Sequence, residues 1–234
     1  GLFTGLDYWK FAKEVDIASW DNYPAWHNNF ESTAELASNV GFVHDIYRSL
    51  KGGQPFLVME STPSLVNWHD TNKLKRPGMH MLGSLQGLAH GADSVLYFQW
   101  RKGRGASEKF HGAVVDHCGH ENTRVFREVS ELGRVLEKIK EVQGSTMKSE
   151  VAIIYDVENK WAIDDLQGLK MKKKEYEETC QKSHRVFWEK GIPTDVINMD
   201  CDFSKYKLIV APMLYMVKQN VAERLNKFVE DGGT

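Results

Sequence analysis

The N-terminal part of the chain alternates between short apolar runs and longer segments whose apolar residues recur at helical spacing. A run such as 56–59 (FLVM) contains no polar residue, which is typical of a strand buried on both faces. The predicted strands are 15–20, 56–60 and 94–100, and the predicted helices are 33–50, a segment opening at Pro77 and a segment from about Thr123. Because strand and helix alternate three times, the sequence predicts three parallel βα units.

The pattern restarts after 144–149 (GSTMKS), which we interpret as a linker. The predicted strands beyond it are 151–156, 194–199 and 206–212, with one helix ending near 189–193 and an amphipathic helix carrying Val217, Val221, Leu225 and Phe228. This order predicts a second parallel α/β unit of flavodoxin-like type, in which 151–156 pairs with 194–198 or 206–212. We therefore predict two domains, 1–147 and 148–234.

Composition narrows the classes of partner. The chain has 234 residues, 41% of them hydrophobic, and a formal net charge of -2, so nothing indicates nucleic acid or an anionic membrane as a partner. No apolar stretch approaches the ~20 residues of a membrane span, and the first residues show no secretory signal. Cys118, Cys180 and Cys201 are odd in number and far apart, which favours a reducing, cytoplasmic location over a disulfide framework.

One short segment, 116–121 (DHCGHE), gathers possible metal ligands. Neighbouring residues of a short loop rarely all point at one ion, and zinc ligands are usually spaced more widely. We therefore expect a polar loop there, with no metal and no cofactor in the chain.

Polar and aromatic side chains follow each strand predicted in 1–147. Asp21, Asn22, Tyr23 and Trp26 follow the first strand, Glu60 ends the second with Asn67 and Trp68 beyond it, and Trp100, Arg101, Glu108 and His111 follow the third. In a parallel α/β barrel the active site is built at the carboxyl ends of the strands. Indole faces cover the C–H faces of a sugar while carboxylates, amides and imidazoles bind its hydroxyls. Taken singly, these residues also fit a solvated glutamate, a packing tryptophan and a surface histidine; their joint occurrence indicates a sugar site.

Four motifs carry a resemblance to a known family: SWDNYP, FLVMESTPSLVNW, YFQWRKGRGASEKFHGAVVDH and ENTRVFREV. They resemble the end of the catalytic barrel in family 42 glycoside hydrolases, the β-galactosidases, and the part from Glu150 onward resembles the α/β trimerisation domain of that family. The resemblance implies that 1–147 is the C-terminal part of a (β/α)8 barrel, comprising strands six to eight. It implies that 148–234 is a partial flavodoxin-like domain.

The resemblance also assigns roles to particular residues. Glu60 matches the nucleophile of a retaining β-galactosidase, and Trp68 matches the aromatic residue that packs on the galactosyl ring. Glu108 and His111 match the pair that binds galactose hydroxyls, and Tyr23 is similar in place to a phenol near the nucleophile. The implied substrate is a β-galactoside or galactooligosaccharide, and the implied assembly is a homotrimer.

One required group is expected to lie outside the chain. Retaining hydrolysis needs a second carboxylic acid about 5–5.5 Å from the nucleophile. In the family this acid/base Glu belongs to strand four, so by resemblance it precedes Gly1. We therefore expect 1–234 to be a piece of a longer enzyme, inactive by itself and prone to self-association through unpaired strand edges.

Three alternatives stay open at this point. The chain fits a non-catalytic oligomerisation or carbohydrate-binding module, which weak galactose binding without hydrolysis would favour. It also fits another retaining glycosidase of the same barrel clan, such as a β-mannanase or β-glucosidase, although the EKFHG segment argues against this. An amidotransferase-like enzyme would need a nucleophilic cysteine at a strand-to-helix turn, and neither Cys180 nor Cys201 lies in one.

Overall fold

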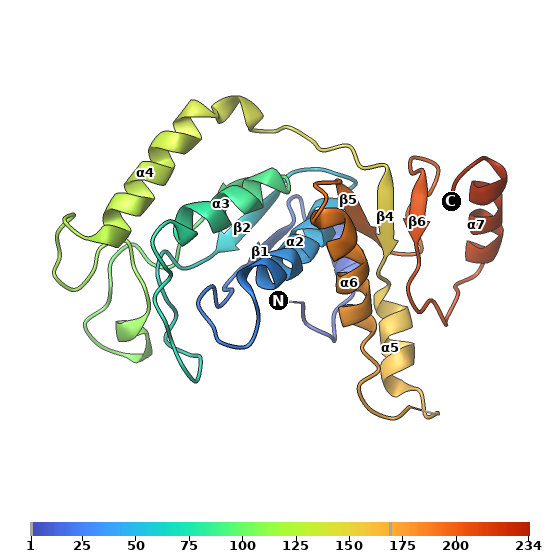
Figure 1. The fold of residues 1–234 in the computed structure, drawn as a ribbon, viewed down its shortest axis with the longest axis horizontal. Helices are drawn as coiled ribbons and strands as arrows, with labels where there is room; N and C mark the ends of the chain where they lie inside the picture. The colour runs from blue at the N-terminus through green and yellow to red at the C-terminus, as the bar shows by residue number, and fades with distance from the viewer. Residues whose placement is uncertain (1, 169) are drawn as a thin grey trace. The chain divides into compact units, whose positions relative to one another are not determined.

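A computed structural model describes residues 2–168 and 170–234 (Figure 1). Its contacts divide the described chain into two compact units. The first unit comprises 19–40 and 55–145, and the second comprises 2–18, 41–54 and 146–234. The long helix α2 (Thr33–Leu50) contributes its first half to the first unit and its second half to the second.

The first unit is built on a parallel sheet with the strand order β1-β2-β3. Its elements are β1 (Ser19–Asp21), β2 (Phe56–Glu60), α3 (Met79–Ala89), β3 (Ala92–Val95), the 3₁₀ turns η1 (Ser107–Phe110) and η2 (Lys140–Val142), and α4 (Arg124–Lys138). Helix α3 packs against β3 and against α4. The three predicted βα units are thus confirmed.

Two predicted strands are shorter in the structure than in the sequence pattern. Residues 15–18 do not pair in the sheet, because the Lys51 ammonium binds the carbonyl of Val15 at 2.7 Å and the Gln54 amide binds that of Asp16. The third strand ends at Val95. The amide of Leu96 still donates to Val58 of β2, and the rest of the 96–100 backbone bonds to Ser61 and to 112–115. Beyond the paired residues, the backbone groups of both apolar runs bond mainly to side chains and loops.

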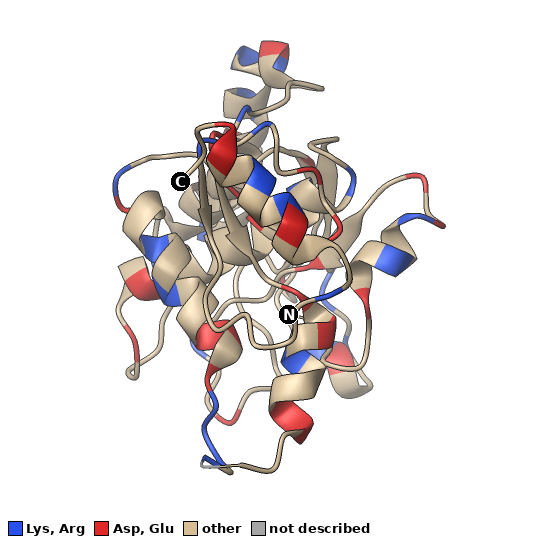
Figure 2. Cartoon of the chain, turned by 90° about the vertical axis from the view of Figure 1, so that its right-hand side faces the viewer, with Lys and Arg blue, Asp and Glu red and all other residues tan. Residues whose placement is uncertain are grey.

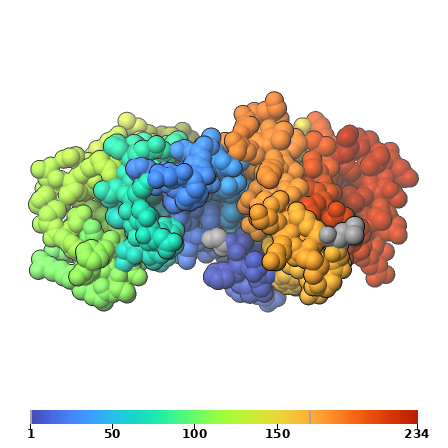
Figure 3. All heavy atoms as spheres, turned by 60° about the horizontal axis from the view of Figure 1, so that its bottom comes forward, coloured from blue at the N-terminus to red at the C-terminus, as the bar shows by residue number. Residues whose placement is uncertain are grey.

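The second unit holds a parallel sheet with the strand order β5-β4-β6. Its elements are α1 (Tyr8–Ala12), β4 (Val151–Ile154), α5 (Val157–Asp165), α6 (Tyr176–Trp188), β5 (Thr194–Ile197), β6 (Leu208–Val210) and α7 (Val221–Glu230). The sequence predicted that 151–156 pairs with one of the other two strands, and β4 in fact pairs with both β5 and β6. Helices α5 and α6 contact one another, and Figure 3 shows one face of each, in gold and orange.

Helix α5 was not predicted. The run 151–156 looked like one strand, but Asp156 ends it and caps α5 by accepting hydrogen bonds from the amides of Glu158 and Asn159. Lys218 places its ammonium 2.9 Å from the other oxygen of Asp156, so the fully buried carboxylate is neutralised. Asp156 therefore serves the local fold rather than a site.

At its end the chain returns to the sheet of the second unit. The amide of Thr234 donates to the carbonyl of Lys207, and the amide of Ile209 donates to the carbonyl of Thr234. This is the hydrogen-bond pattern of a neighbouring parallel strand beside β6. Acidic and basic residues are interspersed over the side of the chain drawn in Figure 2, in keeping with a net charge of -2.

A buried ionic network lies in the second unit. Arg48, on the second half of α2, is 1% exposed and pairs with Asp45 and with Asp195. Asp45 also accepts a 2.7 Å hydrogen bond from His184 of α6, and Asp195 accepts one of 2.8 Å from the phenol of Tyr206. The network therefore joins α2, α6 and β5 through largely buried side chains, and Lys205 extends it to the surface from Asp195.

Candidate active site

The carboxyl ends of the three strands in the first unit lie at one edge of the sheet. The register of β1 and β2 pairs Asp21 with Glu60. Beyond the strands, the amide of Asn22 donates to the carbonyl of Glu60 at 2.7 Å, and the amide of Ser61 donates to that of Leu96 at 3.0 Å. The predicted site segments are therefore held together by a continuing backbone ladder.

Tyr23 lies at the centre of the predicted site residues. Its hydroxyl is 2.8 Å from Oε2 of the partly buried Glu60. Its ring meets Trp68 and His111 edge-on, with ring centroids 5.7 and 5.8 Å away. The structure thus brings together the acid, the phenol, the indole and the imidazole that the sequence singled out.

The electrostatics fix the direction of the Tyr23–Glu60 hydrogen bond. Burial raises the pKa of Tyr23 well above its usual range, and the hydrogen bond and charge of Glu60 raise it further, followed by the charges of Asp21 and Glu108. The phenol therefore stays protonated and donates to the carboxylate. The pKa of Asp21 is also raised, first by burial and then by the charge of Glu60.

His111 is 2% exposed, and its tautomer follows from its surroundings. Nδ1 lies 3.0 Å from the carbonyl of Gly112, which only accepts, so Nδ1 carries a proton, and in the tautomer with that single proton Nε2 is the acceptor. The ring also packs edge-on against Phe98, with centroids 4.9 Å apart. Phe98 was not predicted as a site residue, because it lies inside a predicted strand and its sequence context does not mark it as facing a site.

Trp68 and Glu108 lie on the more open side of the cluster. The indole of Trp68 is 56% exposed, which leaves an aromatic face available to a ligand. The amide of Asn67 donates to the carbonyl of Ser107 and so links the Trp68 loop to η1, which carries Glu108. The carboxylate of Glu108 is exposed, and its charge acts on Tyr23.

A second missed residue is Lys75, whose ammonium binds the carbonyl of Thr62 in the loop after Glu60. Gly112, next to His111, is a third. A Cβ at Gly112 would lie 2.6 Å from the carbonyl oxygen of Leu65 and against the hydroxyls of Thr62 and Ser64. Neither residue is distinctive in the sequence, since its role depends on a neighbour that only the fold supplies.

The polar loop 116–121 forms no cluster of metal ligands. Cys118 Sγ lies 4.0 Å from Nδ1 of His120, and that ring nitrogen accepts a hydrogen bond from the amide of Asn122. Within residues 2–168 and 170–234, no three His, Cys, Asp or Glu side chains are arranged to hold a metal ion. In the same ranges, no helix is long and apolar enough to cross a membrane.

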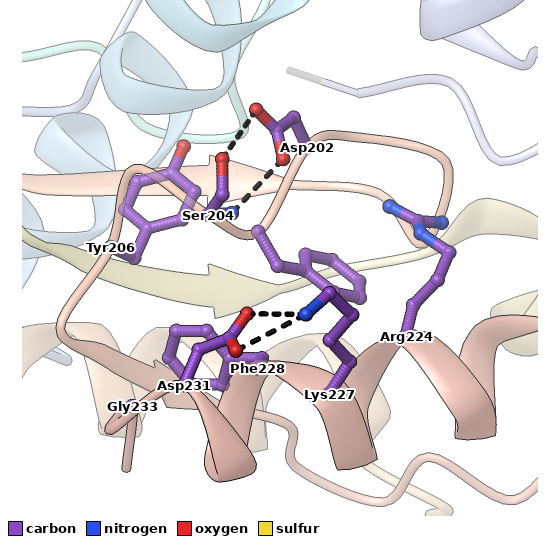
Figure 4. Close-up of a pocket in the computed structure, with 9 residues that line it drawn as sticks. Asp202, Ser204, Tyr206, Arg224, Lys227, Phe228, Asp231 and Gly233 are labelled. Atoms are coloured by element: carbon purple, nitrogen blue, oxygen red, sulfur yellow. Dashed lines mark hydrogen bonds and ion pairs between the residues drawn. The ribbon is translucent and has the colours of Figure 1, made fainter.

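The second unit has a pocket of about 250 Å³ between the segment 202–206 and α7 (Figure 4). The charged side chains that line this pocket already bind other groups of the chain. Arg224 lies over the ring of Phe203 and binds the carbonyl of Met199, while Lys227 pairs with Asp231. The pocket is therefore explained by the packing of a loop against a helix.

Comparison with known proteins identifies the family. The family profile described as β-galactosidase matches residues 1–139, and the profile described as β-galactosidase trimerisation domain matches residues 149–234. β-Galactosidase Pbg of Clostridium perfringens is 61% identical over 100% of this chain and 34% of that protein. β-Galactosidase GanA of Bacillus subtilis is 57% identical over 99% of the chain and 34% of its own length.

Solved structures agree with these matches. The cold-adapted β-galactosidase of Rahnella sp. R3 superposes with a TM-score of 0.96 at 54% identity, over 99% of this chain and 34% of that one. The β-galactosidase of Bacillus circulans sp. alkalophilus gives 0.91 at 44% identity, over 100% and 34%. The chain thus spans about a third of the length of its relatives, as strands six to eight of a (β/α)8 barrel followed by part of a flavodoxin-like domain. Residues 1–234 belong to glycoside hydrolase family 42, the β-galactosidases.

Proposed function

We propose that the protein containing this chain is a retaining β-galactosidase that hydrolyses terminal, non-reducing β-D-galactose residues of β-galactosides, with Glu60 as its nucleophile. The observation that supports this most is the carboxylate of Glu60 at the end of β2, held by a permanently protonated phenol among aromatic side chains. Tyr23 holds Oε2, so the same hydrogen bond that orients the carboxylate leaves Oε1 for attack.

In the proposed reaction, a Glu60 oxygen attacks the anomeric carbon as the bond to the leaving oxygen breaks, giving a covalent galactosyl-enzyme. A second carboxylic acid protonates the leaving oxygen, and as a base it then activates the water that releases galactose. We place that acid outside residues 1–234. Asp21 and Glu108 act electrostatically on Tyr23, but no family motif gives either of them the acid's role.

Galactose recognition is assigned to three residues. The exposed indole of Trp68 covers the C–H face of the ring, as an aromatic platform does in sugar sites. The Glu108 carboxylate accepts hydrogen bonds from hydroxyls. His111 Nε2 also accepts one, because Nδ1 is engaged with Gly112.

We further propose a domain boundary at 147/148, a homotrimer formed through 148–234 and a cytoplasmic location. The profile matches end at 139 and resume at 149, and the second profile is that of a trimerisation domain, which supports the first two proposals. The contact-based units differ in one respect, because they group 2–18 and 41–54 with the second sheet. Three free cysteines suit a reducing compartment.

The decisive experiment uses the full-length protein and the variant Glu60→Ala. Turnover of a nitrophenyl β-galactoside should be abolished, and azide should restore part of it by attacking the anomeric carbon from the vacated side. The product should then be the α-galactosyl azide, since one inversion replaces two. Glu108→Ala is the matched control: it should lower kcat/KM without azide rescue. Undiminished hydrolysis by Glu60→Ala, or a β-galactosyl azide product, would reject the assignment.

A further inference from the structure

The five residues after Glu60 form a loop that is fastened from two sides. On one side, Lys75 donates from its ammonium to the carbonyl of Thr62 and from its main-chain amide to the carbonyl of Ser64 at 2.9 Å. On the other side, the amide of Gly112 donates to the carbonyl of Leu65 at 2.8 Å. The loop thus lies between a buried lysine and the segment that carries His111.

Lys75 is a costly residue to bury. It is 9% exposed, and its ammonium is bound by a main-chain carbonyl, with the charge of Glu128 of α4 as a more distant attraction. Burial lowers the pKa of Lys75 to about 8. Since burying a charge opposes folding unless it is well compensated, a lysine is a costly side chain with which to fasten this loop.

The contacts of the loop lead from Lys75 to both ends of the candidate site. Thr62 is two residues from Glu60, and the carbonyl of Ser61 between them accepts from the amide of Phe98 at 2.8 Å. Phe98 packs against the ring of His111. A shift of the Thr62 carbonyl therefore reaches Glu60 through the chain, and it reaches His111 through the Ser61–Phe98 hydrogen bond and the ring contact of Phe98.

We propose that Lys75 is a positioning residue for the reaction of Glu60: its ammonium holds the Thr62 carbonyl and thereby fixes where the Glu60 carboxylate meets the anomeric carbon. The inference rests on the proposed function. A positioning role differs from a purely structural one, because loss of Lys75 should slow the chemical step more than it weakens substrate binding. A displacement of about 1 Å at a reacting group costs as much as about 10²-fold in rate.

The test measures covalent labelling of Glu60 in the full-length protein by 2,4-dinitrophenyl 2-deoxy-2-fluoro-β-D-galactoside. A Glu60 oxygen bonds to the anomeric carbon while dinitrophenolate leaves with the electron pair, so no proton from the acid/base residue is needed. Mass spectrometry locates the label. The rate constant at saturation, ki, reports the chemical step, and the half-saturating concentration, KI, reports binding.

We expect Lys75→Met to lower ki about 10²-fold with KI changed less than about twofold. Lys75→Arg, which keeps a charged donor, should restore most of the loss. The matched control is Lys51→Met, because Lys51 also binds main-chain carbonyls, those of Ala12 and Val15, in the second unit. It should label at the wild-type rate. If Lys75→Met does not fold by circular dichroism, Lys75→Gln replaces it with the same expected split.

The outcomes separate the inference from the function on which it rests. Wild-type protein that is not labelled on Glu60 overturns the proposed function and this inference with it. Labelling of wild type on Glu60 together with an unchanged ki in the Lys75 variants overturns the inference alone. The same holds if Lys51→Met loses as much ki as Lys75→Met, or if Lys75→Arg is no faster than Lys75→Met, because the lysine would then act only through general stability.

Discussion

The Tyr23 hydroxyl donates a 2.8 Å hydrogen bond to Oε2 of Glu60, across the gap between the segments that follow two adjacent parallel strands. Because burial and the nearby carboxylates hold the pKa of Tyr23 far above its usual range, the phenol keeps its proton at neutral pH. The hydroxyl therefore stays a donor that orients the Glu60 carboxylate.

Removing that donor should slow the reaction. A hydrogen bond to a charged group contributes about 1.5–3 kcal/mol, so Tyr23→Phe in the full-length protein should lower kcat/KM for a nitrophenyl β-galactoside by about 10–100-fold. The alkaline limb of its pH profile should not move, because the phenol does not titrate there. Tyr97→Phe, which removes a hydroxyl paired with Ser84 in the same unit, is the control and should keep wild-type kcat/KM.

Two glycine-to-alanine substitutions should change stability in opposite directions. At Gly112 the added methyl would lie 2.6 Å from the Leu65 carbonyl oxygen, a main-chain atom that cannot swing away, so overpacking should cost about 1–3 kcal/mol. At Gly133, on exposed helix α4, nothing lies within 4 Å of the new methyl, and helix propensity should add about 0.5–1 kcal/mol. Urea denaturation of both variants measures the difference; equal effects would contradict the close packing at Gly112.

Removing the Arg48 guanidinium from the ionic network of the second unit should destabilise the protein. Arg48→Leu removes the buried guanidinium that pairs with Asp45 and Asp195, of which Asp195 keeps the Lys205 ammonium at 3.3 Å. The loss should cost about 3–5 kcal/mol in the free energy of unfolding. Lys140→Ala breaks an exposed ion pair with Glu137 and should change stability by less than about 0.5 kcal/mol. A similar small loss for both variants would show that the buried network contributes little.

The buried imidazole of His80 should lower the free energy of unfolding in mild acid. It is 1% exposed, and burial followed by the charge of Lys75 lowers its pKa from 6.5 to about 3. Between these values the unfolded chain binds the proton and the native protein does not, so stability falls as the pH falls below 6.5. At pH 4.5, about two units below the unfolded-state pKa, the free energy of unfolding should have fallen by about 3 kcal/mol.

The variant His80→Phe isolates this contribution. Phenylalanine keeps the ring contact with Tyr97 but has no proton to gain, so the variant should lose about 3 kcal/mol less than wild type between pH 7.5 and 4.5. The exposed His27→Asn should follow wild type. Parallel curves for wild type and His80→Phe in urea denaturation at the two pH values would show that His80 is protonated in the native state.

Much of the fold was readable from the apolar runs. β2 and β4 are short apolar runs followed by helices or charged segments, so their existence and their parallel direction followed from the pattern. The pattern left open whether β4 pairs with β5 or with β6, and the structure shows both pairings. Helix α5 did not, because its first turn depends on Asp156 as a cap and its sequence has no marked apolar stripe. The early end of the third strand depends on loop partners that no local pattern describes.

The candidate site also contains residues that could be predicted from the sequence and residues that could not. Glu60 and Tyr23 follow adjacent parallel strands, so their proximity could be expected from the order of the elements. Lys75 and Gly112 act through the carbonyls of Thr62 and Leu65, and such main-chain partners leave no mark on the sequence. Side chains that meet at the ends of adjacent strands are therefore easier to predict than side chains that bind the main chain of a loop.

Residues 1–234 by themselves should not hydrolyse a nitrophenyl β-galactoside. Retaining hydrolysis needs a protonated acid about 5–5.5 Å from the nucleophile, and we have placed that acid outside this chain. Asp21 is the residue to exclude, because its pKa is raised and the strand register sets it beside Glu60. The measurement compares release of nitrophenolate by residues 1–234, by their Asp21→Asn and Glu60→Ala variants, and by the full-length protein. Turnover by 1–234 that disappears in both variants would show that Asp21 supplies the acid, and the proposed division of catalytic groups would be wrong.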